Sequence, residues 1–141
     1  MSATRELFLI DTSVWIRVYR RRPVPVLEER ASYLLRREAA VVNQAILTEL
    51  LIGCKTEEEY GILAEQFLGV YALPIEDSTW GLAARLGFRL ARLGIIASVP
   101  DLVIAASAVE HEAVLVHADA DFDRIAASTE LRVESYAQPP I

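Results

Sequence analysis

The sequence predicts an α/β fold with three layers, in which a mainly parallel sheet of four or five strands carries helices on both faces. Short apolar segments alternate along the chain with longer amphipathic ones, which is the pattern of strands joined by crossover helices. The first apolar segment, residues 7–10, is an unbroken run, typical of a strand buried on both faces. No repeat or linker interrupts the 141 residues, so we expect one domain over residues 1–141.

The first helix follows the first strand almost at once. Thr12 and Ser13 can cap its N-terminus, and the apolar segment 14–19 then predicts a helix. Residues 20–22 are all arginine, which suits the negative end of a helix dipole, and Pro23 cannot continue the hydrogen-bond ladder. We therefore expect this helix to end before Pro23.

The remaining elements follow from the same patterns. Further strands are expected at residues 40–42, 69–74, 114–116 and 131–135. The segment 44–53 is apolar nearly all round, which predicts a buried helix closed by a glycine. Other helices are expected at residues 26–38, 56–68, 98–112 and 121–127. A further helix is expected to be capped by Asp77 or Ser78 and to end at Gly94, with a core stripe of Leu82, Leu86, Leu90 and Leu93.

Composition limits the classes of protein that the chain can belong to. The apolar fraction of 53% and the mean hydropathy of +0.29 suggest a surface covered by a partner, either a second copy or another protein. The apolar runs are too short for a membrane span. Cys54 is the single cysteine, which fits a reducing compartment, so we expect a cytoplasmic protein.

The net charge of −6 argues on its own against nucleic-acid binding, because phosphate contacts need basic side chains. Thirteen of the 14 basic residues are arginine, the better phosphate ligand, although genomic codon bias explains the imbalance more simply. The location of the acidic residues is therefore more informative than the net charge.

Two acids stand where an apolar or neutral residue is expected. Asp11 follows the first strand directly, at the edge where open α/β sheets bind ligands, although it could simply cap the helix. Glu49 lies inside the apolar helix 44–53, where a lone buried carboxylate is costly unless it is paired with an arginine or bound to a metal.

Further acids lie nearer the C-terminus. Asp101 stands at the third position of a helix capped by Ser98, where it could complete a capping box, but it shares the inward stripe of that helix. Asp119, Asp121 and Asp123 follow the fourth strand. Turn and cap chemistry accounts for part of this run, and we assign Asp121 mainly to that role and Asp119 to the site.

Carboxylates that converge at one edge of a sheet repel one another and raise their own pKa values unless a cation compensates. Mg²⁺ is the natural cation for an all-oxygen site, and Mn²⁺ accepts the same ligands. Zinc is disfavoured, because His111 and His117 lack ligand spacing with Cys54. We expect His111 near the surface and His117 in a strand-end hydrogen bond.

Four segments resemble the motifs of PIN-domain nucleases, in order and in spacing, over essentially the whole chain. The segments are LIDTS at 9–13, TELLIG at 48–53, PDLVIAA at 100–106 and DADF at 119–122. The form of the second motif and the length of the chain are most similar to VapC-type toxins of bacterial toxin–antitoxin pairs. His117 departs from the pattern, since such proteins usually carry Thr or Ser there.

The resemblance implies a metal-dependent endoribonuclease, a phosphodiester hydrolase that is the toxin of a toxin–antitoxin pair. The catalytic and metal-binding acids would be Asp11, Glu49, Asp101 and Asp119, supported by Asp121 and by the hydroxyl of Thr12 or Ser13. Mg²⁺, replaceable by Mn²⁺, would activate a water that attacks the phosphate in line and leaves a 5′-phosphate and a 3′-hydroxyl. Glu49 or Asp119 would orient or deprotonate that water.

The resemblance also implies partners. RNA would be drawn in by peripheral arginines, namely Arg17, Arg20, Arg21 and Arg22, or by the stripe Arg85, Arg89 and Arg92, although a solvated or antitoxin-facing surface explains each set equally well. A homodimer is expected, with a groove that accepts a helix of a small antitoxin.

Three other protein classes compete with this interpretation. A response-regulator receiver needs an acceptor Asp after its third strand and a late lysine, whereas the chain has Leu73-Pro74 and no lysine after Lys55. A haloacid-dehalogenase phosphatase needs a second Asp where Ser13 stands. A catalytically silent PIN fold that serves only as a binding module stays open.

Overall fold

The computed structural model describes residues 5–19 and 24–138, and all structural statements concern these residues. It contains a five-stranded sheet in the order β3-β2-β1-β4-β5, in which every pairing is parallel. The strands are β1 (Phe8–Ile10), β2 (Ala40–Asn43), β3 (Tyr71–Leu73), β4 (Val114–His117) and β5 (Val133–Ser135). This confirms the predicted parallel sheet.

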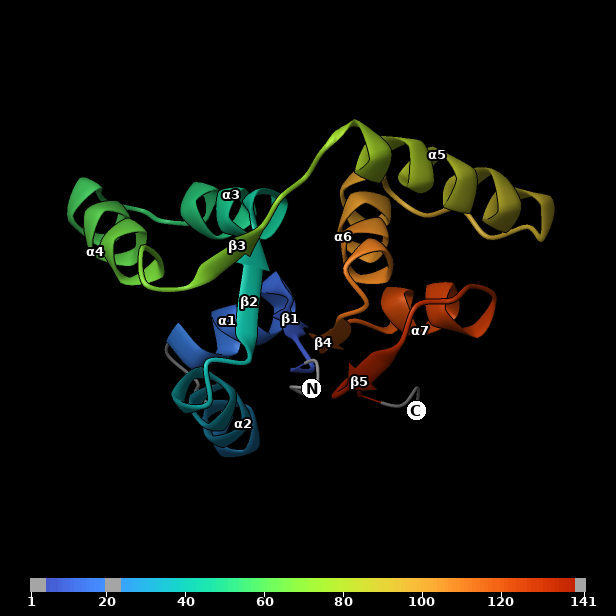
Figure 1. Ribbon diagram of the computed structural model, residues 1–141. Coiled ribbons are helices and arrows are strands. Elements are labelled where there is room, and N and C mark those ends of the chain that lie inside the picture. The colour runs from blue at the N-terminus through green and yellow to red at the C-terminus, as the bar shows by residue number, and fades with distance from the viewer. Residues whose placement is uncertain (1–4, 20–23, 139–141) are drawn as a thin grey trace.

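Seven helices in the described residues connect and flank the strands. They are α1 (Thr12–Tyr19), α2 (Pro25–Arg36), α3 (Gln44–Ile52), α4 (Glu57–Phe67), α5 (Asp77–Arg92), α6 (Val99–Glu110) and α7 (Ala120–Ala127). Figure 1 shows α1 to α4 toward one side of the central strands and α5 to α7 toward the other. The molecule therefore has the three layers that the sequence predicts. No helix in the described part of the chain has the length and apolar character needed to cross a membrane.

The central strand β1 owes its position to its apolar sequence. Leu9 and Ile10 are fully buried, and Leu9 stands opposite Val41 of β2 and Leu115 of β4. A strand with neighbouring strands on both edges and helices on both faces is shielded from water. Its side chains therefore have to be apolar. Directly after Ile10 the chain reaches the carboxyl edge of the sheet.

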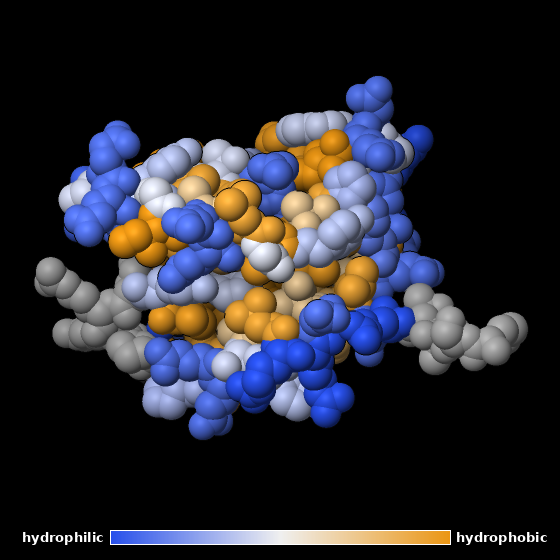
Figure 2. Space-filling view, turned by 60° about the vertical axis from the view of Figure 1, so that its left-hand side comes forward, coloured by the Kyte–Doolittle hydropathy of each residue, from blue (hydrophilic) through white to orange (hydrophobic). Residues whose placement is uncertain are grey.

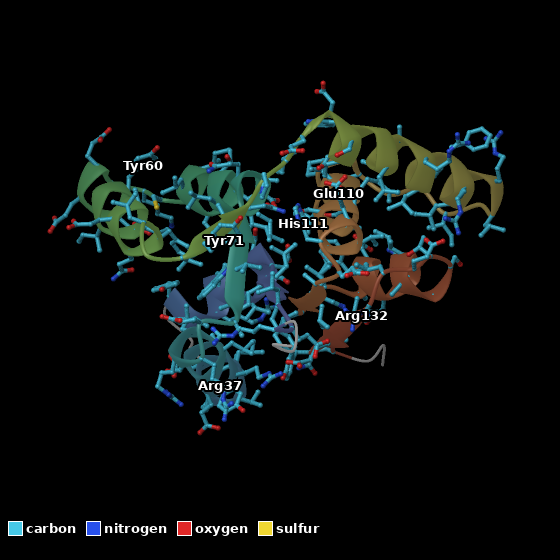
Figure 3. The ribbon with its side chains drawn as sticks, in the orientation of Figure 1. Arg37, Tyr60, Tyr71, Glu110, His111 and Arg132 are labelled. Atoms are coloured by element: carbon cyan, nitrogen blue, oxygen red, sulfur yellow. The ribbon has the colours of Figure 1, made fainter. Side chains whose placement is uncertain are left out.

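Helices α5 and α6 pack against each other in opposite directions. The hydroxyl of Thr79, in the first turn of α5, accepts a hydrogen bond from the backbone N–H of Glu76 and donates one of 2.5 Å to Glu110. His111 follows Glu110 and lies 3.2 Å from the carbonyl oxygen of Pro74. Figure 3 shows Glu110 and His111 near the start of α5. These contacts fix α6, whose other end carries Asp101.

Three expectations about helices were wrong. The N-cap of α5 is Glu76 rather than Asp77 or Ser78, because Glu76 is the last residue with an extended backbone. Leu93 is exposed, because α5 ends before it, and the buried stripe is instead Thr79, Ala83, Leu86 and Leu90. Helix α3 buries only Ile46 and Leu50 and leaves Ile52 77% exposed, because only one side of it meets neighbouring elements.

Arg30 on α2 connects that helix to the edge strand β5. Its guanidinium donates two hydrogen bonds of 2.8 and 2.7 Å to the carboxylate of Glu134, and the Tyr136 hydroxyl donates a third to the same group. The guanidinium also lies over the ring of Phe8, 5.2 Å from its centroid. Two-pronged pairing of this kind is stronger than an ordinary surface ion pair.

We predict that Arg30→Ala lowers the free energy of unfolding by about 1–2 kcal/mol, because a charge-assisted, partly buried pair is lost. Chemical denaturation measures this change. Arg36→Ala is the matched control, since Arg36 lies on the same helix, is exposed and, within the described part of the chain, bonds only the nearby Ser32 side chain. Equal losses in both variants would contradict a special role for Arg30.

Candidate metal and active site

The predicted acids gather where β1 and β4 end. These strands are neighbours, with Ile10 opposite Val116, and the backbone N–H of Asp11 donates to the carbonyl of Val116. Asp119 follows β4 by two residues. Because parallel strands end at the same edge of a sheet, residues over a hundred positions apart in sequence lie together.

Asp11 is buried, with only 4% of its surface exposed. Its Oδ2 accepts hydrogen bonds from the backbone N–H of Ser13 at 3.0 Å and from the Ser13 hydroxyl at 2.6 Å. Burial raises the pKa of Asp11, and the bonds from Ser13 partly oppose that shift. Asp11 is thus held in one orientation by the first turn of α1.

Ser13 connects the two strand ends. While its hydroxyl donates to Asp11, its oxygen accepts a hydrogen bond of 2.9 Å from the backbone N–H of Ala118. The loop after β4 is therefore joined to the loop after β1 through one side chain. The Ser13 hydroxyl serves to position Asp11.

Glu49 lies at the rim of the site and not in a buried helix interior, so the expectation of deep burial was wrong. Its Oε1 accepts a hydrogen bond of 3.2 Å from the Thr12 hydroxyl. Partial desolvation, followed by the charge of Asp11, raises the pKa of Glu49. No arginine pairs with Glu49 among the contacts of the described residues, in contrast to the salt-bridge alternative.

Asp101, Asp119 and Asp121 form a compact acidic cluster, in which one oxygen from each carboxylate lies within 4.8 Å of the others. Ser98 caps α6 by accepting the backbone N–H of Asp101, which leaves the Asp101 carboxylate at the start of the helix. Asp11 borders this cluster, since its charge acts on Asp101, and Glu49 lies on the other side of Asp11, whose charge acts on it as well.

The pKa of Asp101 is raised to about 6. Desolvation is the largest cause, and the negative charges of Asp119 and Asp11 add to it. Such a shift is expected where carboxylates converge without a compensating cation.

The assignment of capping to Asp121 was wrong, whereas Asp119, which was assigned to the site, does lie in the acidic cluster. Asp119 itself caps α7, since its Oδ1 accepts the backbone N–H of Asp121 at 2.9 Å. Asp121 instead points into the cluster and forms an ion pair with Arg124, one turn later in α7. The cap falls on Asp119 because that residue has the extended backbone that an N-cap requires.

His117, at the end of β4, is fully buried and makes hydrogen bonds through both ring nitrogens, which confirms its prediction as a hydrogen-bonding residue. Nδ1 accepts the backbone N–H of Asp119 at 3.1 Å, and Nε2 lies 3.1 Å from Oδ1 of Asp123. Burial lowers the pKa of His117.

None of the predicted arginines within the described residues forms a hydrogen bond or ion pair with the acidic cluster. Arg17 is exposed and donates to the carbonyl of Ser13, one turn earlier in its own helix. Arg20, Arg21 and Arg22 lie outside the described residues. In the second stripe, Arg89 pairs with Glu130 and Arg92 lies over the ring of Phe88.

Two contributors were missed at the sequence level. Asn43 ends β2 and caps α3 by accepting the backbone N–H of Ile46, and so positions the helix that carries Glu49. An Asn between a strand and a helix was the available signal. Arg124 was missed although its spacing of three residues from Asp121 on the predicted helix 121–127 was an available signal.

The comparisons with known proteins agree with this geometry. The family model described as PIN domain matches residues 8–128, so the chain belongs to the PIN-domain family. Within that family it is 35% identical to the VapC ribonuclease Mb1587 of Mycobacterium bovis over 135 residues, covering 92% of this chain and 99% of that protein. Ribonuclease VapC11 of Mycobacterium tuberculosis matches with the same identity and coverage.

Solved structures share the fold at lower sequence identity. The DNA-bound VapBC structure from Salmonella typhimurium superposes with a TM-score of 0.78 at 21% identity, over 94% of this chain and 99% of that one. FitAcB from Neisseria gonorrhoeae gives a TM-score of 0.76 at 18% identity, over 90% and 96%.

We predict that Asp101→Asn stabilises the metal-free protein at pH 7.5 by about 1 kcal/mol and has little effect at pH 4. A carboxyl group whose pKa is raised by folding favours the native state when protonated, and this contribution is lost as the pH rises from about 4 through about 6. The full shift corresponds to about 3 kcal/mol, which we reduce because Asp101 is partly solvated.

Denaturation in chelator-treated buffer at both pH values measures this difference. Asp77→Asn, a change of an exposed acid on α5, serves as the control. If Asp101→Asn changed the free energy of unfolding by the same amount at pH 4 and at pH 7.5, folding would not raise the pKa of Asp101.

Proposed function

We propose that the protein is a metal-dependent endoribonuclease and the toxin of a toxin–antitoxin pair, acting as a single PIN domain over residues 1–141 in the cytoplasm. The observation that carries the proposal is the acidic cluster at the carboxyl edge, with the buried Asp11 beside it. The names of the VapC relatives, which are ribonucleases, support RNA as the substrate class.

The residues fit a hard divalent cation. All candidate ligands are carboxylates, which Mg²⁺ and Mn²⁺ prefer, and three of them place oxygens within 4.8 Å of one another. Burial raises the pKa of Asp101 most, and the charges of Asp119 and Asp11 raise it further, a repulsion that a bound cation would offset. We propose that Asp101, Asp119 and Asp121, together with Asp11, hold Mg²⁺ there, and that Mn²⁺ can replace it.

A divalent ion held by these carboxylates would lower the pKa of a bound water and screen the charge that develops on a scissile phosphate. The residues of the chain have separate tasks around it. Asp11 is fixed by Ser13 and keeps one orientation through the reaction. Glu49, at the open rim with a raised pKa and a contact to Thr12, is placed to accept a proton from the attacking water.

The alternative is a PIN fold that binds RNA or protein without cleaving it. The presence of Asp11, Glu49, Asp101 and Asp119 in one region favours the enzyme, because a binding surface for a polyanion gains nothing from clustered carboxylates. The decisive difference between the two functions is cleavage that depends on these acids.

We predict that RNA cleavage by the purified protein stops in EDTA, returns with Mg²⁺ or Mn²⁺, and falls about 100-fold or more in Asp11→Asn. Metal-ion catalysis supplies several kcal/mol, and each 1.4 kcal/mol or so is worth about tenfold in rate. The amide keeps an oxygen that can accept from Ser13, so the fold is expected to persist, which circular dichroism checks.

Asp77→Asn is the control and should cleave like the unaltered protein. Cleavage by Asp11→Asn at the normal rate would point to a contaminating nuclease and would sink the proposal. Binding of RNA without cleavage by the unaltered protein would favour the silent module.

We further propose that an apolar groove between α1, α3 and α4 receives a helix of the cognate antitoxin, and that the protein is a homodimer. The groove has a volume of about 350 Å³ and includes Trp15, Tyr19, Leu50, Ile62 and Leu63. Figure 2 shows apolar side chains at several places among polar ones on the side of the molecule turned forward there. Two of the groove helices, α1 and α3, also carry Thr12 and Glu49.

We predict that Ile62→Glu weakens antitoxin binding by about tenfold or more and leaves RNA cleavage unchanged, because a charge would be buried against an apolar helix face. Calorimetry with the antitoxin encoded beside the gene measures the affinity. Leu68→Glu is the matched control, since Leu68 caps α4, is 84% exposed and lies outside the groove. An unchanged affinity in Ile62→Glu would place the antitoxin elsewhere.

A further inference from the structure

We propose that His117 is a positioning residue for Asp119, holding its backbone so that its carboxylate stays in the acidic cluster. This inference rests on the proposed metal site and assigns a task to a buried side chain that takes no part in the chemistry.

The hydrogen bonds define one form of the imidazole. Because the backbone N–H of Asp119 points at Nδ1, that nitrogen must be an acceptor and carries no proton. The ring proton is then on Nε2, which donates to Oδ1 of Asp123 at 3.1 Å. Both nitrogens are occupied, so His117 has no free nitrogen for a metal or for a substrate proton.

Asp123 is itself fixed from the other side. Its second oxygen, Oδ2, accepts a hydrogen bond of 2.9 Å from the Ser135 hydroxyl at the end of β5. The ring of Phe122 lies 5.4 Å from the imidazole, centroid to centroid, and closes one side of it. A continuous chain of contacts therefore runs from β5 through Asp123 and His117 to Asp119.

This series of contacts ends at Asp119, whose carboxylate belongs to the acidic cluster. Asp119 is held at its backbone N–H by His117 and at its Oδ1 by the backbone N–H of Asp121. Two points of attachment leave the carboxylate little freedom to turn away from Asp101 and Asp121. Residues that orient metal ligands in this way typically change metal affinity or activity by about 10–100-fold when they are replaced.

The test compares His117→Gln with His117→Asn, because each amide keeps one of the two ring contacts. The Asn oxygen falls near the place of Nδ1 and can accept from Asp119, whereas the Gln amide reaches toward Asp123 and leaves the Asp119 N–H without its acceptor. The readouts are the dissociation constant for Mn²⁺, measured by electron paramagnetic resonance of the free ion, and kcat and KM for RNA.

We expect Mn²⁺ to bind about tenfold or more weakly to His117→Gln, with a lower kcat and an unchanged KM, and His117→Asn to stay within about threefold of the unaltered protein. Leu115→Ala is the control for lost stability, since Leu115 is fully buried two residues earlier on the same strand. It should be less stable but bind Mn²⁺ normally.

Asp123→Ala gives a second route if His117→Gln does not fold, because it removes the partner of Nε2 from a half-exposed position. It should weaken Mn²⁺ binding in the same direction, because the ring proton is then no longer held on Nε2, and a proton on Nδ1 removes the acceptor of the Asp119 N–H. An Asn at position 117 has no such choice of tautomer. Unchanged Mn²⁺ affinity in either folded variant would overturn the positioning role alone. A lack of Mn²⁺ binding by the unaltered protein would contradict the proposed metal site, and this inference with it.

Discussion

The parallel pairing of β1 with β4 is the constraint on which the rest of the structure depends. It brings the residues after Ile10 and after His117 to one edge of the sheet, although the two strands are far apart in sequence. Other residues of the site are arranged around this pair of strands. Ser13 joins the loops that follow them, and Asp101 lies at the start of α6. If the register of these strands shifted by one residue, the acids would point to opposite faces of the sheet.

In the absence of a cation, the acidic site lowers the stability of the folded protein. Asp11 is buried, and Asp101 resists ionisation at pH values where most carboxyl groups are charged. Folding tolerates this because the surrounding core is apolar and closely packed, with Leu9, Ile104 and Leu115 fully buried around the strand ends. A cluster of carboxylates beside an apolar core lowers stability. Such clusters are typical of sites that are selected for function.

Much of this arrangement could be predicted from the sequence, and the exceptions have physical causes. Apolar runs marked the strands, and acids directly after them marked the edge, because both signals are local. The exposure of Glu49 could not be predicted. Helix α3 is apolar nearly all round, and its sequence does not reveal that one of its sides is left uncovered by the rest of the fold. The position of the α7 cap, on Asp119 and not on Asp121, depends on one backbone conformation, which either residue could have adopted.

Ser13 limits how this chain can diverge. Its hydroxyl is a donor to Asp11 and at the same time an acceptor for the N–H of Ala118, so both hydrogen-bonding capacities are used within the protein. Alanine or cysteine at this position would leave a buried acid and a loop amide poorly satisfied together. Evolutionary drift at position 13 should therefore be restricted to side chains with a hydroxyl on the β-carbon, even in descendants whose substrates differ.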